Sequence, residues 1–463
     1  MNTLSDKRKQ DLSLTLFYAS FLFLWVSVFP PAGRAGEGWL SARQQEKVYY
    51  VQQIFLIAGM LACAARCQFL SGRRKHLVLA LFVFAVFLPG VAVLLFADSG
   101  TPFYLAVSFA VMLCLGELCG EVYHRMSRET ACGTDTAGCM GVGSAAAIAL
   151  QYLLQIRWGQ TPVLPVLMLA AVLMLAYRLL TQEEVSPEKD TPASGPVQPS
   201  RLLTTSLITV LFLLFLCFYN AYLHHRTVQP DSSATGAYTW PRLITILCYL
   251  LFAVIGDRKQ GRLVPLAALL ITLAATLNSV LTGSRGAYWL NMCLFYSAAA
   301  ATICYYTLRF WQLAPGTKCP ALWASMGRII DCAMVLVTGS LRLDTLPAAG
   351  ILGLDLAGVA LIILIMAVSG DFNLTEAEVP EVQSLCSPEE TLARMRERYN
   401  LTAREAEVLR ELVQTEDKQT VVSKRLSIQV KTLQDYVTRL YRKTGASTRA
   451  GLTDLYYETR EQR

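Results

Sequence analysis

The sequence is short of charge. Charged residues make up 16% of the chain and hydrophobic residues 54%, whereas a soluble globular domain carries roughly a quarter charged residues. A single soluble domain is therefore excluded, although a length of 463 residues would hold about three domains of roughly 150 residues each. A membrane protein is the class that fits. The net charge of +7 is too small to indicate a nucleic-acid-binding protein by itself.

The motifs of enzymes and metalloproteins are also missing. The chain has no CxxC pair, no glycine-rich phosphate-binding loop and no nucleophile with a paired base, so we expect no enzyme activity, no cofactor and no metal site. Most of its 13 cysteines lie in apolar runs, where we expect them to act as small hydrophobic side chains. The closest pairs are Cys63 with Cys67, Cys114 with Cys119, and Cys132 with Cys139.

Long apolar runs are abundant. A helix needs about 20 mainly apolar residues to cross a bilayer core about 30 Å thick, and twelve runs of this kind predict a polytopic helical bundle. The first run follows MNTLSDKRKQ without a small-residue cleavage pattern, so we expect it to be a retained span. The runs lie near residues 12–31, 48–69, 77–97, 102–122, 138–157, 161–180, 202–223, 238–256, 263–282, 287–308, 321–341 and 347–369.

A polar, proline-rich segment at 181–201 reads as a linker that divides the spans six and six. If the N-terminus is cytoplasmic, the cytoplasmic loops through residue 320 hold 17 Lys and Arg residues and the outer loops hold eight. This imbalance predicts a multi-pass protein of the cytoplasmic membrane. Because the number of spans is even, both termini are expected in the cytoplasm.

The composition changes after residue 370, so residues 1–370 form the expected membrane domain and a charged tail follows. Residues 371–399 read as a linker and a connecting helix, which begins at Ser387 and Pro388 with an N-cap and a proline in the first turn. Residues 400–463 predict a separate domain of four short helices.

The first and third of these helices have clear signatures. Thr402 and Glu405 form a capping box at the start of the first helix. The third helix has one apolar face and one polar face. Its apolar face carries Leu433, Val437, Leu440 and Tyr441.

The order of residues in this tail resembles the LuxR-type helix-turn-helix of bacterial transcription regulators over about residues 401–457. The resemblance is carried by Leu401, Thr402, Arg404, Glu405, Glu407, Val408, Leu409, Leu426, Ile428, Thr432, Tyr441, Lys443, Gly445 and Arg449. It implies that the third helix lies in the major groove of double-stranded DNA and that the last helix supports a homodimer. The alternative is a basic helical module that binds another protein.

This resemblance also implies which side chains meet DNA. Four side chains would contact the bases or the DNA backbone: Gln434, Asp435, Thr438 and Arg439. Three would lie near phosphates: Lys431, Arg442 and Lys443. Residues 391–463 hold 15 basic and ten acidic side chains, and the resulting local charge of +5 favours contact with DNA.

The membrane part resembles the major facilitator superfamily in its six-plus-six arrangement. That family's signature loop is partly matched by Asp257, Arg258, Gly261 and Arg262, and by Gly72 and Arg73 in the first half. The whole chain is similar to membrane-embedded regulators that carry a LuxR-type module. The expected fold is therefore all-α, with about 12 spans and a C-terminal four-helix helix-turn-helix domain.

Ionisable residues inside spans are candidates for binding a ligand, because each costs about 2.5 to 3.5 kcal/mol on insertion scales. The candidates are Glu117, Arg328, Asp331 and Asp355. The alternative for Arg328 and Asp331, which lie three residues apart, is a structural ion pair. The function expected is a one-component regulator that senses an unidentified small molecule in the membrane and binds promoter DNA. The alternative is a secondary transporter with a regulatory tail.

Overall fold

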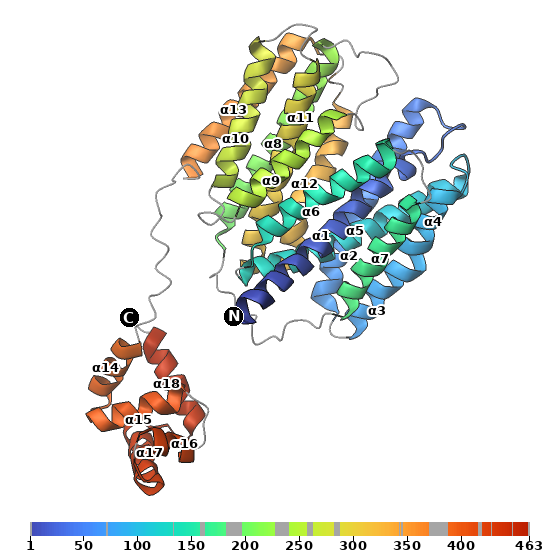
Figure 1. Cartoon of the computed structure of the whole chain (residues 1–463). Helices are drawn as coiled ribbons and strands as arrows, with labels where there is room; N and C mark the ends of the chain where they lie inside the picture. Colours follow the sequence, from blue (N-terminus) through green and yellow to red (C-terminus); the bar gives the residue numbers. More distant parts are fainter. Residues whose placement is uncertain are drawn as a thin grey trace. The chain divides into compact units, whose positions relative to one another are not determined.

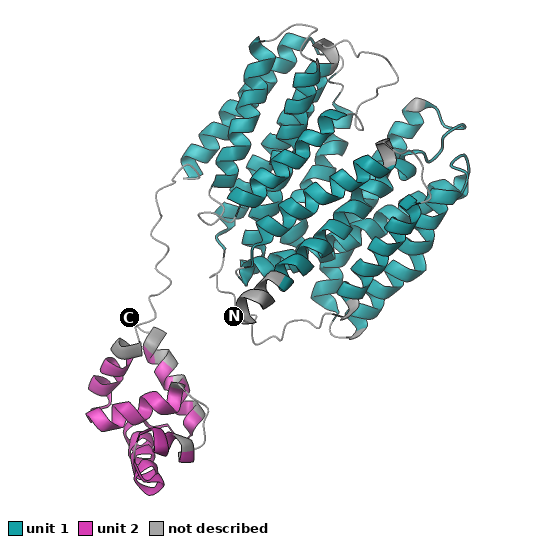
Figure 2. Cartoon of the chain, in the orientation of Figure 1, with its two compact units in different colours: residues 1–374 teal, residues 375–463 magenta. Residues whose placement is uncertain are grey.

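A computed structural model gives the fold of the chain (Figure 1). It describes residues 2–70, 73–132, 134–157, 163–181, 197–226, 240–256, 263–281, 288–341, 343, 346–369, 388–414, 419–426, 428–446 and 448–461. Every regular element in these ranges is helical, in agreement with the all-α class expected. The chain divides into two compact units, Met1–Leu374 and Thr375–Arg463 (Figure 2).

Each of the twelve apolar runs contains a helix of the first unit. In chain order the elements of this unit are α1 (Asn2–Gly33), α2 (Ala42–Phe69), α3 (Arg73–Leu81), η1 (Phe82–Phe87), α4 (Leu88–Phe96), α5 (Pro102–Ala131), α6 (Thr136–Gln151), η2 (Tyr152–Arg157), α7 (Val163–Thr181), α8 (Pro199–Arg226), η5 (Trp240–Leu243), α9 (Ile244–Ile255), α10 (Leu263–Leu281), α11 (Tyr288–Leu313), η8 (Ala314–Gly316), α12 (Pro320–Ser340) and α13 (Ala348–Ser369).

Within the described ranges, nine helices are long and apolar enough to cross a membrane. Two further apolar helices, Val163–Leu179 and Trp240–Ile255, are shorter. The long helix α11 is not among the nine, and it carries four tyrosines and two tryptophans. The positions of the twelve predicted helices are therefore confirmed, whereas the count of twelve spans stays a prediction.

Segments predicted between helices are only partly described. In the linker predicted at 181–201, Thr181 ends α7 and Pro199 begins α8. Residues 182–196 lie outside the described residues, as does the predicted N-cap Ser387. Gly72, in the loop motif of the first half, also lies outside the described residues, as do all four motif residues of the second half, at 257–262.

Two consecutive prolines near the end of α1 remove backbone donors, and side chains of other helices occupy carbonyls there. Pro30 has no N–H for the carbonyl oxygen of Val26, which instead accepts a hydrogen bond from Gln151 Nε2 at 2.6 Å. The hydroxyl of Tyr104 donates to the carbonyl of Pro31 at 2.6 Å. Gln151, a polar residue inside an apolar run, is thus explained by the backbone of α1.

Helices α2 and α5 pack with their backbones close together because glycines face the neighbouring helix. A Cβ atom on Gly59 would lie 2.0 Å from the carbonyl oxygen of Leu113, and one on Gly116 would lie 2.2 Å from that of Leu56. One turn further along α5, a Cβ atom on Gly120 would lie 2.7 Å from Cys63 Cβ. This spacing brings the C-terminal part of α2 directly against α5.

The helices before and after the predicted linker pack into one unit. Helix α12 contacts α2 and α5, α11 contacts α5, and α6 contacts α9. One buried hydrophobic core contains side chains of both six-helix halves, α1–α7 and α8–α13. We use the term half interface for the contacts between these two sets of helices.

The second unit has five helices in its described residues. They are α14 (Pro388–Arg398), α15 (Ala403–Gln414), α16 (Gln419–Arg425), α17 (Val430–Thr444) and α18 (Arg449–Glu461). The sequence treats the first of these as a connecting helix outside the domain, but α14 packs against α15 and α18, and Met395 is fully buried in their common core. The unit has its own hydrophobic core, separate from that of the first unit.

Candidate functional site

The candidate DNA-reading helix, α17, is amphipathic in the way the sequence predicts. Leu433, Val437 and Leu440 are buried in the core of the second unit. The opposite face is exposed and carries six of the seven predicted DNA-contact residues. These are Lys431, Gln434, Asp435, Thr438, Arg439 and Arg442.

The C-terminal end of α17 is set by a local residue, whereas its start has no side-chain cap. At the start, Gln429 has an extended backbone and its side chain makes no capping hydrogen bond. At the end, Gly445 has φ +77°, and its N–H donates to the carbonyl of Tyr441 at 2.9 Å. A glycine is favoured at this position because other L-residues are strained in the left-handed region.

The seventh predicted residue, Lys443, is only half-buried but is held inside the unit. Its Nζ donates to Glu405 Oε2 at 2.7 Å and to the carbonyl of Asn400 at 2.9 Å. Asn400 itself has φ +47°, which asparagine tolerates better than most residues. Lys443 therefore ties the end of α17 to the start of α15, and its charge is partly neutralised there.

The predicted capping box of α15 is confirmed. Glu405 N–H donates to Thr402 Oγ1 at 3.3 Å, and Thr402 N–H donates to Glu405 Oε2 at 2.8 Å. Burial by itself would raise the pKa of the Glu405 carboxyl, but the hydrogen bonds from Lys443 and Thr402 outweigh it and hold that pKa below its ordinary value. Glu405 is thus ionised and joined to two helices at neutral pH.

Two arginines of the resemblance also bind backbone inside the unit. Arg404 Nη2 donates to the carbonyl of Leu426 at 2.9 Å, just beyond the end of α16. Arg449 Nε donates to the carbonyl of Leu412 at 3.0 Å, in the last turn of α15. Carbonyls at helix ends lack intrahelical donors, so these arginines hold helices together and are not part of the exposed face.

The exposed face of α17 carries more positive than negative charge. Lys431, Arg439 and Arg442 outnumber Asp435. The guanidinium carbon of Arg439 lies 5.8 Å from the ring centroid of Tyr436, within the range of a cation–π contact. Thr438 Oγ1 donates to the carbonyl of Gln434 at 2.9 Å, and its oxygen can still accept a hydrogen bond.

Arg328 and Asp331, both on α12, form the ion pair that the sequence left as an alternative. Arg328 Nη1 lies 2.6 Å from Asp331 Oδ2, which also accepts from the hydroxyl of Tyr306 at 3.1 Å. The Arg328 guanidinium lies 5.1 Å from the ring centroid of Trp25 on α1. Its Nε is buried and has no hydrogen-bond partner among the described residues. Arg328 thus belongs to the half interface and keeps one donor free.

Glu117, on α5, belongs to a different group of charges. Its Oε1 lies 2.5 Å from Arg66 Nε, and Arg66 Nη2 lies 2.6 Å from Glu121 Oε2. Glu121 Oε1 is bound in turn by Arg125 Nε at 2.8 Å. The sequence-based candidates leave out Arg66, Glu121 and Arg125. Arg66 and Glu121 lie within three residues of the ends of the predicted runs near 48–69 and 102–122, and Arg125 lies beyond the second of these runs, in a stretch that α5 includes.

Asp355 stands apart from both groups, on α13. It is buried, and its Oδ1 has no hydrogen-bond partner in the described part of the chain. Ile351 and Val359, one turn to either side, pack in a small core with Tyr219. The four membrane candidates therefore lie in three settings, and only Arg328 and Asp331 are brought together.

No protein-family model matches this chain, and no curated protein matches it at a significant level.

Proposed function

We propose that this protein is a membrane-embedded one-component transcriptional regulator. Its membrane unit senses a small molecule, and its C-terminal unit binds promoter DNA through α17. The observation that carries the proposal is the contrast between the two sets of residues on and around α17. Motif residues such as Arg404, Glu405 and Lys443 make contacts inside the C-terminal unit. The basic face of α17 is exposed and does not pack in the core of that unit.

This exposed face fits duplex DNA in size and charge. An α-helix with its side chains is about 10 to 12 Å across, which matches a major groove about 12 Å wide. Arg439 is suited to a bidentate contact with guanine, whereas Lys431 and Arg442 are suited to phosphates. Asp435 is tolerated in the groove only where it accepts a hydrogen bond, as from a cytosine amino group.

The proposal requires a cytoplasmic C-terminus, because the C-terminal unit must meet DNA. Twelve crossings from a cytoplasmic N-terminus would place it there. Fusions of an export-dependent reporter and of a cytoplasm-dependent reporter after Arg463 test this orientation. Activity of the export-dependent fusion alone would contradict both the orientation and the regulatory function.

Chromatin immunoprecipitation of the full-length protein, followed by sequencing, tests DNA binding directly. We expect a few strong sites upstream of genes. Arg439→Ala should weaken the binding free energy by about 1 to 3 kcal/mol, which lowers occupancy, and should relax the preferred sequence. Arg442→Ala should weaken binding at all sites similarly. Arg410→Ala is the matched control, since Arg410 is exposed on α15 and is not part of the α17 face. Occupancy unchanged by both α17 variants would exclude α17 as the reading helix.

A secondary transporter of the major facilitator type with a regulatory tail is the second candidate. It is favoured by Asp355, a buried carboxyl group of the kind that carries ions or protons in transporters. Uptake in vesicles that contain the purified protein, abolished by Asp355→Asn, together with no chromatin enrichment would favour this candidate.

A further inference from the structure

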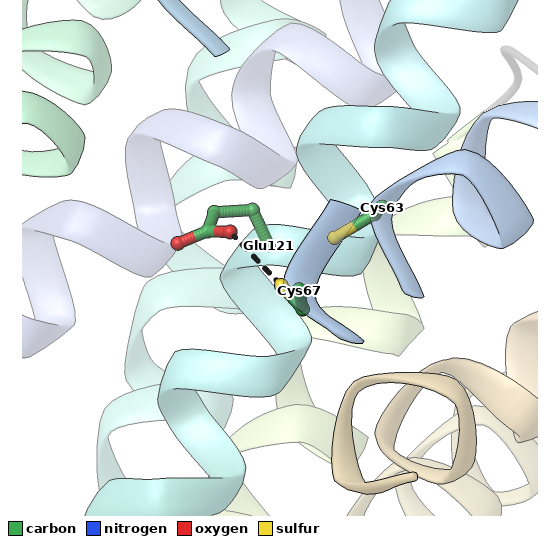
Figure 3. Close-up of side chains that lie close together, drawn as sticks. All are labelled: Cys63, Cys67 and Glu121. Carbon is green, nitrogen blue, oxygen red and sulfur yellow. Dashed lines mark hydrogen bonds between the residues drawn. The ribbon is translucent and has the colours of Figure 1, made fainter. Parts of the chain in front are cut away.

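Two cysteines and a glutamate that the proposed function does not use lie together where α2 packs on α5 (Figure 3). Cys63 and Cys67 are one helical turn apart on α2, and Glu121 comes from α5. The two sulfur atoms and a carboxylate oxygen of Glu121 all lie within 4.8 Å of one another. The Cys67 thiol donates to Glu121 Oε2 at 3.9 Å.

We propose that Cys63, Cys67 and Glu121 bind a zinc ion. Zinc takes thiolate, imidazole and carboxylate ligands in tetrahedral geometry, at about 2.3 Å for sulfur and about 2.0 to 2.2 Å for oxygen. These bond lengths place the tetrahedral ligand atoms, two sulfurs and one oxygen, about 3.5 to 3.8 Å apart. The three donor atoms lie within 4.8 Å of one another, so they need to approach by at most about 1.3 Å, which rotations of their side chains can supply.

The packing of the two helices holds the donors in this arrangement. Spacing of four residues places both thiols on one face of α2. Gly120, which precedes Glu121, lets α5 approach so closely that an added Cβ atom would lie 3.0 Å from Cys63 Sγ. The donors therefore come from two rigid helices, as a preorganised metal site requires.

Metal binding leaves the net charge of this region unchanged. Zinc enters as a dication, and the two thiols each release one proton to solvent as they become thiolates. The fixed charges nearby are the cations Arg66, Arg125 and Lys75, all of which act on Glu121, and the anion Glu117. Because two positive charges replace two protons, no new unbalanced charge is buried.

Glu117 supplies the acceptor that Arg66 needs when Glu121 turns to the metal. Arg66 Nη2 now donates to two of the three proposed ligands, to Glu121 Oε2 at 2.6 Å and to Cys63 Sγ at 3.7 Å, and Arg66 Nε binds Glu117 Oε1 at 2.5 Å. Arg66 Nη2 must therefore leave both ligands when zinc binds. Glu117 Oε2 is buried and has no hydrogen-bond partner among the described residues. Arg66 Nη2 can transfer to this free oxygen, which converts the Arg66–Glu117 contact into a bidentate pair. Glu121 keeps its bond to Arg125 through Oε1.

The site has an open fourth position and a route for entry. Three protein ligands leave one tetrahedral position for water or an external ligand, and Cys67 is only half-buried near the end of α2. Arg125, bound to Glu121, also donates to the carbonyls of Arg178 and Leu179 in α7 at 3.2 Å and 2.6 Å. Zinc would thus join α2 to α5, and Arg125 would connect the metal ligand Glu121 to the end of α7. This inference does not depend on whether the C-terminal unit binds DNA.

Cobalt titration of the full-length protein tests the site. The protein is purified in detergent, kept reduced and stripped of metal with a chelator. We expect Co²⁺ to give a thiolate-to-cobalt charge-transfer band that Zn²⁺ displaces, and calorimetry in buffers of different ionisation enthalpy to give two protons released per Zn²⁺.

Three thiol variants identify the ligands. Cys63→Ser and Cys67→Ser should each lower the charge-transfer intensity per cobalt by about half, and the double variant should abolish it. Cys132→Ser, which removes an exposed thiol elsewhere on the chain, should leave it unchanged. Circular dichroism checks that each variant is folded.

Glu117→Gln tests the exchange of Arg66. It should weaken Zn²⁺ binding about 10- to 100-fold, the usual effect of an outer-shell partner, while leaving the charge-transfer intensity per bound cobalt at the wild-type level. A loss of intensity per cobalt would instead contradict the role of Glu117.

Alkylation of the unaltered protein provides a test that does not depend on variant folding. Zn²⁺ should slow the reaction of Cys67 with a maleimide, measured by mass spectrometry, and leave Cys132 unaffected. A folded wild-type protein with no charge-transfer band would overturn the proposal. So would a band that persists in the double variant, or Cys67 alkylation unchanged by Zn²⁺.

Discussion

Gly445 shows how a single residue decides where α17 stops. Its φ of +77° lies in the left-handed region, where a residue with a Cβ atom is disfavoured by about 1 to 2 kcal/mol. Gly445→Ala should therefore destabilise the second unit by about that amount. Hydrogen exchange of α17 and α18 peptides in the full-length protein measures the change.

Gly451→Ala is the matched control, because Gly451 lies within α18 without a positive φ and an added Cβ atom would make ordinary contacts. Alanine favours a helix over glycine by about 0.5 to 1 kcal/mol, so this variant should slow exchange. Equal effects of the two substitutions would show that backbone strain at Gly445 is not what ends α17.

The Glu405 carboxyl gives the second unit a defined response to acid. Its pKa is below the ordinary value of 4.5 in the folded state, so ionised Glu405 contributes stability that is complete above that value. This contribution is lost as the pH falls through the lowered pKa. Glu405→Gln should cost about 1 to 2 kcal/mol at pH 7, through the cap and the bond to Lys443, and should flatten the dependence of stability on pH below about 4.5.

Glu407→Gln is the control for Glu405. Glu407 pairs with Arg404 at the surface, where both side chains are more than a third exposed, and such pairs contribute about 0 to 1 kcal/mol. Chemical denaturation of the C-terminal unit at several pH values separates the two variants. If the two variants lose the same free energy of unfolding with the same dependence on pH, the internal contacts of Glu405 contribute no more than the exposed pair of Glu407.

Residue by residue, local signals were readable from the sequence and distant pairings were not. The capping box needs only Thr402 and Glu405 at the right spacing. The pairing of Arg66 with Glu117 joins residues 51 positions apart and depends on the register of α2 against α5. That register is set by glycine contacts, which a hydropathy pattern does not reveal.

At the scale of elements, the helices themselves were predictable because apolar runs of span length have few other solutions in a membrane. Their ends were not. Helix α2 begins at Ala42, with a capping box at Ser41, although the run of apolar residues begins later. Helix α5 continues to Ala131 with charged and polar residues in its last turns. Local capping and tertiary contacts, not hydropathy, determine these ends.

Helix α14 belongs to the C-terminal unit by its packing, and this gives a prediction at the scale of that element. Met395 is fully buried in the core formed with α15 and α18. A fragment from Pro388 to Arg463 should therefore fold alone as a cooperative helical unit. Met395→Ala should lower its stability by about 2 to 5 kcal/mol, the usual cost of emptying a buried methionine site.

Urea denaturation followed by circular dichroism tests both statements. A fragment that starts at Asn400, where the sequence alone places the domain boundary, should be less stable by at least as much as the Met395→Ala variant. Arg396→Ala, on an exposed position of α14, controls for the effect of alanine on helix propensity without emptying a buried site. Equal stability of the long and short fragments would mean that α14 contributes nothing to the fold.

The membrane unit as a whole is organised around contacts between its two halves. Arg328 makes a contact across the half interface, because its guanidinium on α12 lies over Trp25 of α1. Within its own half the guanidinium lies beside Tyr306 of α11. A change in how the halves meet must alter these contacts. The sequence offered Arg328 and Asp331 as a pair, but only the contact of Arg328 with Trp25 of α1 gives the pair a position at the half interface.

Arg328→Gln should uncouple sensing from output if an anionic ligand competes with Asp331 for Arg328. A ligand shifts a two-state equilibrium only by its differential affinity, and a change from 1:99 to 99:1 requires about 5.5 kcal/mol. A buried guanidinium whose Nε has no hydrogen-bond partner among the described residues is a group that can contribute on that scale. Asp331 keeps the hydrogen bond from Tyr306 in the variant, so the membrane unit should still fold.

The measurement is the transcriptional response to a panel of small carboxylates. We expect the Arg328→Gln variant to reach normal membrane levels and promoter occupancy. It should not respond to any compound of the panel that activates or represses the wild type. Arg201→Gln, at an exposed position near the start of α8, should respond as the wild type does. A dose curve that is the same for Arg328→Gln and the wild type would assign the ion pair a structural role and place the sensing site elsewhere in the membrane unit.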